Sequence, residues 1–251
     1  MTFVIFLKSE TKQFAERIDT TMITKDTTIE EMIQLDTQFK SLAHRYDLND
    51  MSLTIAQLEL DMKLNSQFFL ELIDIFANDK QFSITSLKSF EIPVILEYLS
   101  RTHRYYLDKK LPEMENLTFE LAKGVDKSMN ELLYFFFLKF STELKKHIEY
   151  EENIVFPYIL KLNQGLAPDT DRNAFRLKKF LNFHNHDIED QLGDFRLHLE
   201  TTFKELQDSL AFNLFCQHTT SFEKDLKIHA LIEDDVLMPK ALEMEKKHVG
   251  S

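Results

Sequence analysis

The sequence predicts an all-α protein, an up-down-up-down four-helix bundle preceded by a small helical domain. Of its 251 residues only four are glycine and five are proline, against average usages of about 7% and 5%. Because these residues make most turns, the chain must consist mainly of long helices. Apolar residues recur at helical spacing along four long segments, which are 90–122, 127–163, 173–202 and 207–247.

Residues 25–78 are expected to form the small helical domain. Thr27 and Glu30 have the spacing of a capping box, in which a hydroxyl and a carboxylate each accept the other residue's backbone N–H. Apolar residues then recur with a helical period, a polar loop follows at 47–52, and two more short helical segments come after it. The polar stretch 78–89 lacks strong periodicity and is the best candidate for a linker.

The second predicted domain, residues 86–248, contains the four long segments. The breaks between them contain Gly124, then Gly165 and Pro168, which are turn-forming residue types. Short connections between long helices favour antiparallel neighbours, and therefore a four-helix bundle. The chain has 23 phenylalanines and no tryptophan, so a core rich in phenyl rings is expected, with the three phenylalanines at 135–137 inside it.

Charge and composition exclude several classes of protein. A formal charge of −12 argues against nucleic-acid binding, which needs clustered lysine and arginine, and disfavours an anionic membrane surface. One cysteine excludes a disulfide framework and sites built from several thiolates. No stretch reaches the ~20 apolar residues of a membrane helix, and the apolar start at 3–7 lacks the features of a signal peptide. We expect a soluble cytoplasmic protein.

The second and fourth long segments contain the same motif, with its histidines 82 residues apart (229 minus 147). The first copy consists of Glu143, Leu144, Lys145, His147, Glu151, Glu152 and Pro157, and the second of Asp225, Leu226, Lys227, His229, Glu233, Asp234 and Pro239. The other two long segments carry lone histidines, His103 and His186, at a similar offset of 83 residues (186 minus 103). This repetition predicts two helical hairpins of one type, related by a pseudo-twofold axis.

The spacing of the repeated motif is typical of a metal site. Residues four apart lie one turn apart on one helix face, so an imidazole and a carboxylate at this spacing can ligate a common centre. Two such helices facing each other bring two histidines and two glutamates inward, and the lone histidines complete the set. The predicted metal ligands are His103, His147, Glu151, His186, His229 and Glu233.

The ligand types narrow the choice of metal. Imidazole and carboxylate without thiolate suit iron, manganese or zinc rather than copper(I) or an iron–sulfur cluster. A carboxylate can bridge two metals, so Glu151 and Glu233 suit a dinuclear site with open positions for a small exogenous ligand. The expected cofactor is a pair of non-haem iron ions, carboxylate- and oxo-bridged, with manganese or zinc as alternatives.

Several neighbouring residues have two interpretations. Glu143 and Asp225 each precede a predicted ligand by one turn, and they could orient an imidazole or be surface acids paired with lysine. His184 is nearer the apolar stripe than His186 and is the alternative ligand; otherwise it is a histidine that donates to a carbonyl or carboxylate. The remaining acids around the motif are expected on a solvated face, namely Glu149, Glu152, Asp234 and Asp235.

At these residues the chain resembles the hemerythrin-like di-iron proteins of the repair-of-iron-centres (RIC) family. The matching stretches are Thr102-His103 through Leu111-Pro112, His147-x3-Glu151 with Phe156-Pro157, His186-Asp187, and His229-x3-Glu233 with Val236-Leu237-x-Pro239. The histidine–aspartate match favours His186 over His184. The family often has paired histidines in its first helix, where this chain has His103 followed by Arg104. We take His103 as the ligand; Arg104 would remove one donor if the family's ligand were the second of the pair.

Residues 25–78 are similar to the small N-terminal domain of that family, through the stretches 28–31 and 45–48. Family members typically carry two adjacent cysteines after the second stretch, whereas this chain has Asn49-Asp50-Met51-Ser52. The resemblance therefore implies a domain without thiol chemistry, whose other role would be helical interaction or dimerisation.

The resemblance implies a stress-response function. The di-iron centre would react with nitric oxide or oxygen species, or supply iron to damaged iron–sulfur proteins. The implied partners are O2, NO and damaged iron–sulfur proteins. Neither nucleic acid nor a membrane is expected as a partner, and the chain could form a homodimer. The alternative function is a non-catalytic hemerythrin-like protein that binds or senses O2, NO or iron, and a metal-free helical scaffold is the third.

Overall fold

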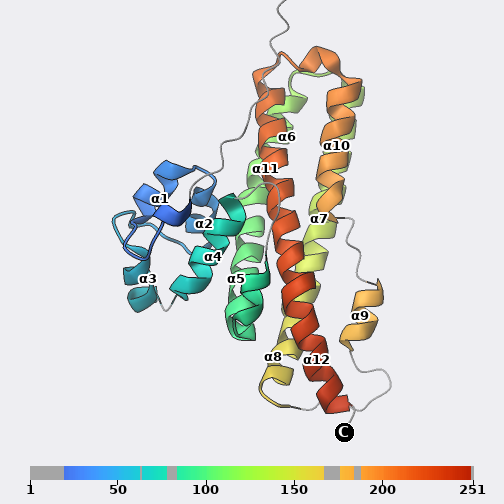
Figure 1. The fold of residues 1–251 in the computed structure, drawn as a ribbon. Coiled ribbons are helices and arrows are strands. Elements are labelled where there is room, and N and C mark those ends of the chain that lie inside the picture. Colours follow the sequence, from blue (N-terminus) through green and yellow to red (C-terminus); the bar gives the residue numbers. More distant parts are fainter. Residues whose placement is uncertain (1–19, 63, 78–83, 167–175, 184–187, 250–251) are drawn as a thin grey trace, which may run out of the picture.

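A computed structural model of the chain describes residues 20–62, 64–77, 84–166, 176–183 and 188–249 (Figure 1). Every regular element in these ranges is helical, and Thr28 and Thr54 form an isolated bridge rather than a strand. The prediction of an all-α protein is therefore confirmed. None of the described helices combines the length and the apolar character needed to cross a membrane.

Four short helices precede the long ones and lie beside α5 in Figure 1. They are α1 (Ile29–Leu35), α2 (Phe39–Arg45), α3 (Ile55–Met62) and α4 (Ser66–Ala77). The capping box that starts α1 joins Thr28 and Glu31: the Glu31 N–H donates to the Thr28 hydroxyl at 3.2 Å, and the Thr28 N–H donates to the Glu31 carboxylate at 2.8 Å. The expected pair, Thr27 and Glu30, was wrong by one residue, because Thr27 instead accepts the backbone N–H of Thr24.

Three long helical rods pack against one another, and each is interrupted by a π turn. The first consists of α5 (Ile92–Tyr105), η3 (Tyr106–Lys110) and α6 (Leu111–Ala122). The second consists of α7 (Lys127–Tyr150), η4 (Glu151–Val155) and α8 (Phe156–Asn163). The third consists of α11 (Leu210–Ile232), η6 (Glu233–Leu237) and α12 (Met238–Val249). Their positions agree with three of the four long segments predicted from apolar spacing.

A proline lies two residues after the last residue of each π turn, at position 112, 157 or 239. Proline has no N–H and its ring collides with the carbonyl four residues earlier, so an uninterrupted α-helix cannot continue through it. In each rod the chain inserts a wider turn before the proline, closed by an N–H that donates to the carbonyl five residues back. The position of each proline therefore determines where the helix changes from α-type to π-type hydrogen bonding.

The remaining predicted segment, 173–202, contains two described helices, α9 (Leu177–Phe183) and α10 (Ile188–Thr202). Residues 173–175 and 184–187 lie outside the described residues, so one continuous helix stays a prediction. In Figure 1, α10 lies along the upper half of the rods, where it packs against α7 and α11, while α6 also packs against these two helices. Short 3-10 turns complete the described elements, at Thr20–Met22, Thr85–Ser89 and Lys204–Leu206.

The buried apolar side chains form two clusters. One joins α1–α4 with α5, α8, α9 and α12, and the other fills the space between α6, α7, α10 and α11. Phe140, Phe215 and Phe222 are fully buried, but the expectation for 135–137 was wrong in part, because Phe135 is 70% exposed on α7. Buried polar side chains from α5, η4, α11 and η6 lie where the two clusters meet, and they are Thr102, His103, Glu151, Asp225, His229 and Glu233. The limits of the two predicted domains stay a prediction.

Candidate metal centre

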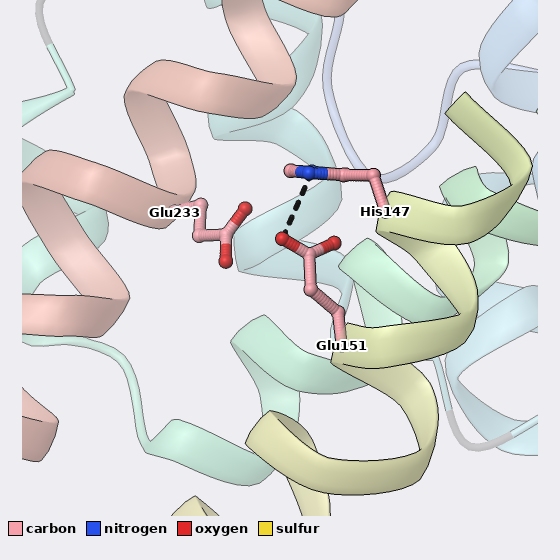
Figure 2. Close-up of side chains that lie close together, drawn as sticks. All are labelled: His147, Glu151 and Glu233. Atoms are coloured by element: carbon pink, nitrogen blue, oxygen red, sulfur yellow. Dashed lines mark ion pairs between the residues drawn. The ribbon is translucent and has the colours of Figure 1, made fainter. Parts of the chain in front are cut away.

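His147, Glu151 and Glu233 form the centre of this polar layer. Figure 2 shows the two carboxylates facing each other, with the imidazole of His147 directed at Glu151. One donor atom from each residue lies within 4.8 Å of the other two, and His147 Nε2 is 2.9 Å from Glu151 Oε1. Glu151 and Glu233 are buried, and His147 is 14% exposed at its side chain. The group could hold a metal ion.

Both glutamates are placed by π turns. Glu151 is the first residue of η4 and Glu233 is the first residue of η6. The Glu151 carbonyl accepts the N–H of Phe156, and the Glu233 carbonyl accepts the N–H of Met238, five residues on in each case. Single π turns inside α-helices occur frequently at functional sites. The repeated spacing from glutamate to proline therefore positions a carboxylate as well as bending a helix.

His103 is the next donor of the site. Its Nε2 lies 3.2 Å from Glu151 Oε2, and its Nδ1 lies 2.7 Å from Glu152 Oε1. The imidazole also stacks on the ring of Phe156, with a centroid separation of 5.4 Å and an interplanar angle of 7°. A carboxylate on one nitrogen of an imidazole fixes its orientation and tautomer, and in metal sites it leaves the other nitrogen to bind the ion.

His229 extends the site on the side of α11. Its ring centroid lies 4.8 Å from that of His103 and 5.8 Å from that of Tyr106. Within the part of the chain that the structure describes, its buried Nε2 has no hydrogen-bond partner. A buried polar nitrogen without a partner is costly and calls for an explanation. Coordination of a metal ion would satisfy this nitrogen.

The protonation states of the site follow from burial and from its internal contacts. Burial lowers the pKa of His229 well below its ordinary value, and the nearby charge of His103 lowers it further. Burial also opposes the charged forms of His103 and Glu151, but contacts with oppositely charged groups outweigh it: Glu151 and Glu152 raise the pKa of His103, and His103 and His147 lower the pKa of Glu151. Without a metal ion, the site therefore favours an ionised Glu151 and a neutral His229, while the carboxylates around His103 favour its protonated form, so metal binding through His103 would release a proton.

Five of the six predicted ligands lie in or beside this one layer: His103, His147, Glu151, His229 and Glu233. The sixth, His186, and the alternative His184 both lie outside the described residues. Arg104 is exposed while its neighbour His103 is buried, so the histidine is the residue that faces the site.

The two acids expected to orient imidazoles have other contacts. Asp225 is buried and forms an ion pair with Arg45, and the hydroxyl of Tyr106 donates to it at 3.0 Å. Glu143 is 40% exposed at its side chain and accepts the side-chain amide of Gln191 at 2.9 Å. In the described part of the chain, no hydrogen bond or ion pair found for either acid involves a histidine.

The acid that does contact an imidazole is Glu152. It was expected on a solvated face, but it is half-buried and bonds both His103 and Ser100. Glu152 lies one turn after the buried Ile148, so helical spacing is compatible with this contact, but the identity of its partner depends on how α5 packs against this rod. A usable signal was present, since both copies of the motif have an acid directly after the glutamate.

The sequence interpretation gave Arg45 no role in the site, and it took Tyr106 as a residue that could approach the metals but more often packs in the core. Tyr106 opens the π turn η3 and precedes Pro112 by six residues, which is the spacing of Glu151 to Pro157 and of Glu233 to Pro239. That third occurrence of the spacing could have marked Tyr106 as a residue of the site. Arg45 opens the matching stretch 45–48, but nothing in that stretch indicates its partners, which it reaches through the packing of α2 on α5.

Comparison with known proteins does not assign a family. No protein-family model matches the chain, and no curated protein matches it significantly. The molecule is thus an all-helical protein with long packed helices and, among its described residues, one buried His/Glu/Glu group that could hold a metal ion.

Proposed function

We propose that the polar layer holds a dinuclear non-haem iron centre in a hemerythrin-like bundle, and that the protein acts in nitrosative and oxidative stress as RIC-type proteins do. The observation that carries this proposal is the buried group His147, Glu151 and Glu233, with His103 3.2 Å from Glu151. The sixth proposed ligand, His186, lies outside the described residues.

The proposed bundle has an up-down-up-down topology. Its support is the set of neighbours around the second apolar cluster, where α6 contacts α7 and α11, and α10 contacts the same two helices. The three rods and the segment of α9 and α10 also follow one another in the order that alternating directions require. Such a bundle would surround inward donors with apolar layers on both sides.

The residues fit iron by their chemistry. Imidazole and carboxylate donors without thiolate suit iron, and equally manganese or zinc. The buried Nε2 of His229, which lacks a hydrogen-bond partner among the described residues, is one donor that a metal would satisfy. Glu151 and Glu233 supply negative charge where both neighbouring apolar clusters exclude water, which strengthens their attraction for cations.

When bound, the iron pair would supply an Fe(II)/Fe(III) couple and positions for a small molecule. The residues of this chain would hold the two iron ions and orient their ligands. Glu151 and Glu233 would supply carboxylate ligands, and Glu152 would keep the imidazole of His103 directed inward. Phe156, stacked on that imidazole, would keep water from one side of it.

The proposal is tested with protein purified without added metal and then reduced. Catalytic loss of NO in solution, proportional to the iron content of the protein, would support it. Restoration of activity in an iron–sulfur enzyme damaged by NO would support the repair function in particular. Protein that carries iron but neither consumes NO nor restores the enzyme would contradict both forms of the proposed function.

A second candidate function is a non-catalytic protein that binds or senses O2, NO or iron. It is favoured by residues 49–52, which lie between α2 and α3 and contain no cysteine for thiol redox chemistry. Reversible O2 binding in a fixed ratio to the iron pairs, without turnover of NO, would select this function over the first.

A further inference from the structure

Arg45, the last residue of α2, extends its side chain into the polar layer. The side chain is fully buried, and its guanidinium carbon lies 4.6 Å from the ring centroid of Tyr105 and 5.2 Å from that of Phe76. Its Nε donates to the Thr102 hydroxyl at 3.1 Å, and its Nη2 donates to Asp225. One planar group therefore joins α2 to both α5 and α11.

Both partners of Arg45 lie next to histidines of the proposed site. Thr102 directly precedes His103 on α5, and Asp225 lies one turn before His229 on α11. Tyr106 adds a second link, because its hydroxyl donates to Asp225 at 3.0 Å while its ring lies 5.8 Å from that of His229. The relative position of the two helices at this level is therefore fixed by a residue of the small N-terminal unit.

A buried ion pair is an expensive way to join helices. The cost of removing both charges from water can exceed their attraction, and apolar residues of similar volume often stabilise a protein as well. What arginine adds is geometry, because its rigid fork can hold two acceptors at a fixed separation, which lysine or an apolar side chain cannot.

We infer that Arg45 is a positioning residue of the metal centre: it holds α5 and α11 so that the imidazoles of His103 and His229 meet with ring centroids 4.8 Å apart. This inference rests on the proposed function. It gives the small N-terminal unit a structural role in the site that needs no cysteine pair, and it gives Asp225 the role of an anchor for Arg45.

A positioning role and a purely electrostatic role of Arg45 predict changes of different sign in metal affinity. If Arg45 and Asp225 acted only through charge, R45M would leave a buried anion and increase affinity for a cation, while D225N would leave a buried cation and decrease it. A positioning role predicts that both single substitutions decrease affinity, because each releases one helix from the other.

The experiment uses the full-length chain with Co²⁺ as the metal probe. Co²⁺ affinity and the visible absorption bands are measured for the unchanged protein, R45M, D225N, the R45M/D225N double variant and R45K. The free energy of unfolding of each metal-free protein is measured in urea. R101M is the matched control: Arg101, on α5, likewise places its guanidinium over an aromatic ring, 5.0 Å from the centroid of Tyr46, but its ion pair is with Glu97 on the same helix.

We expect about 10-fold weaker Co²⁺ binding in both single variants, the size typical for residues that support metal ligands. The double variant should recover stability, since it buries no unpaired charge and the amide that D225N introduces can still accept from the hydroxyl of Tyr106. Its Co²⁺ affinity and absorption bands should nevertheless stay altered, because the link between the helices is still missing. R45K should bind Co²⁺ as weakly as R45M, and R101M should match the unchanged protein.

Three results would overturn the inference. Unchanged Co²⁺ affinity and bands in R45M and D225N would remove it while leaving the proposed function intact. Opposite effects of R45M and D225N on affinity would assign the pair an electrostatic role instead, and recovery of both stability and affinity in the double variant would assign it a merely structural one. Absence of metal uptake by the unchanged protein would overturn the proposed function together with this inference.

Discussion

The Nδ1 atom of His103 lies 2.7 Å from a carboxylate oxygen of Glu152, a residue of the π turn that begins at Glu151. The opposite nitrogen of the same imidazole lies 3.2 Å from Glu151. Two consecutive acids on one rod therefore contact the two nitrogens of one histidine on another rod. Glu151 is fully buried, whereas the side chain of Glu152 is 35% exposed. A substitution of Glu152 therefore disturbs the buried core less than one of Glu151.

Glu152→Gln tests whether this contact orients the imidazole. The amide can still bond Nδ1, but it removes the charge that fixes the orientation and tautomer of His103, so metal affinity should fall about 10-fold. Titration with Fe²⁺ under anaerobic conditions measures the change. Glu149→Gln is the control, because Glu149 is exposed on the preceding turn of α7. Equal affinities of the two variants would remove Glu152 from the site.

Glu233→Ala should abolish metal binding without unfolding the protein. The substitution removes one of the two central carboxylates but leaves the apolar clusters on both sides in place. Metal added at 100 times its dissociation constant should stabilise the unchanged protein by about 2.7 kcal/mol and should not raise the melting temperature of the variant. Asp235→Ala is the control from the same π turn, since Asp235 is exposed. A variant that keeps its metal would contradict the role of Glu233.

Pro239→Ala tests whether the π turn costs stability. Alanine supplies an N–H and removes the ring that prevents α-helical continuation, a constraint that costs about 3 kcal/mol or more in a helix interior. The metal-free variant should therefore be more stable to urea, while its metal affinity falls because Glu233 leaves its position. Pro93→Ala, in the first turn of α5, should change neither quantity in this way. Lower stability of metal-free Pro239→Ala would show that the proline imposes no strain.

Thr28→Ala tests the corrected start of α1. Loss of an N-cap hydroxyl costs about 1 kcal/mol of unfolding free energy at neutral pH.

The backbone N–H and hydroxyl of Thr28 lower the pKa of Glu31 below 4.5, so the stabilisation from this carboxylate is present above that pH and is lost as pH falls through the lowered pKa. Urea unfolding of Glu31→Gln should therefore show less acid sensitivity than the unchanged protein. An equal decrease in acid sensitivity in the control Glu30→Gln would contradict the assignment of the cap.

The sequence predicts the site best where the pattern is local. His147 and Glu151 lie one turn apart on one helix, and their contact at 2.9 Å follows from that spacing alone. The limits of the three rods also follow from apolar periodicity. The error at Thr27 has a simple cause, because two consecutive threonines and two consecutive glutamates at 27–31 offer the same capping spacing twice, and only packing selects between them.

Contacts that depend on tertiary packing were not predictable from spacing. Glu152 meets His103 because α5 packs against the rod that carries Glu152, and the sequence pattern around either residue does not specify that packing. Arg45 meets Asp225 across 180 residues of sequence, and nothing near either residue indicates the pairing. Both contacts need the relative position of two helices, which apolar periodicity does not contain.

The most direct test of the central claim is the metal content of the full-length protein, purified without added metals. The proposed centre predicts two iron ions per chain, with an absorption spectrum typical of an oxo-bridged ferric pair. Manganese or zinc in the same ratio would keep the ligand assignment but change the chemistry proposed for it. Protein that contains no metal, and takes up none when Fe²⁺ is supplied anaerobically, would contradict a metal centre at His147, Glu151 and Glu233.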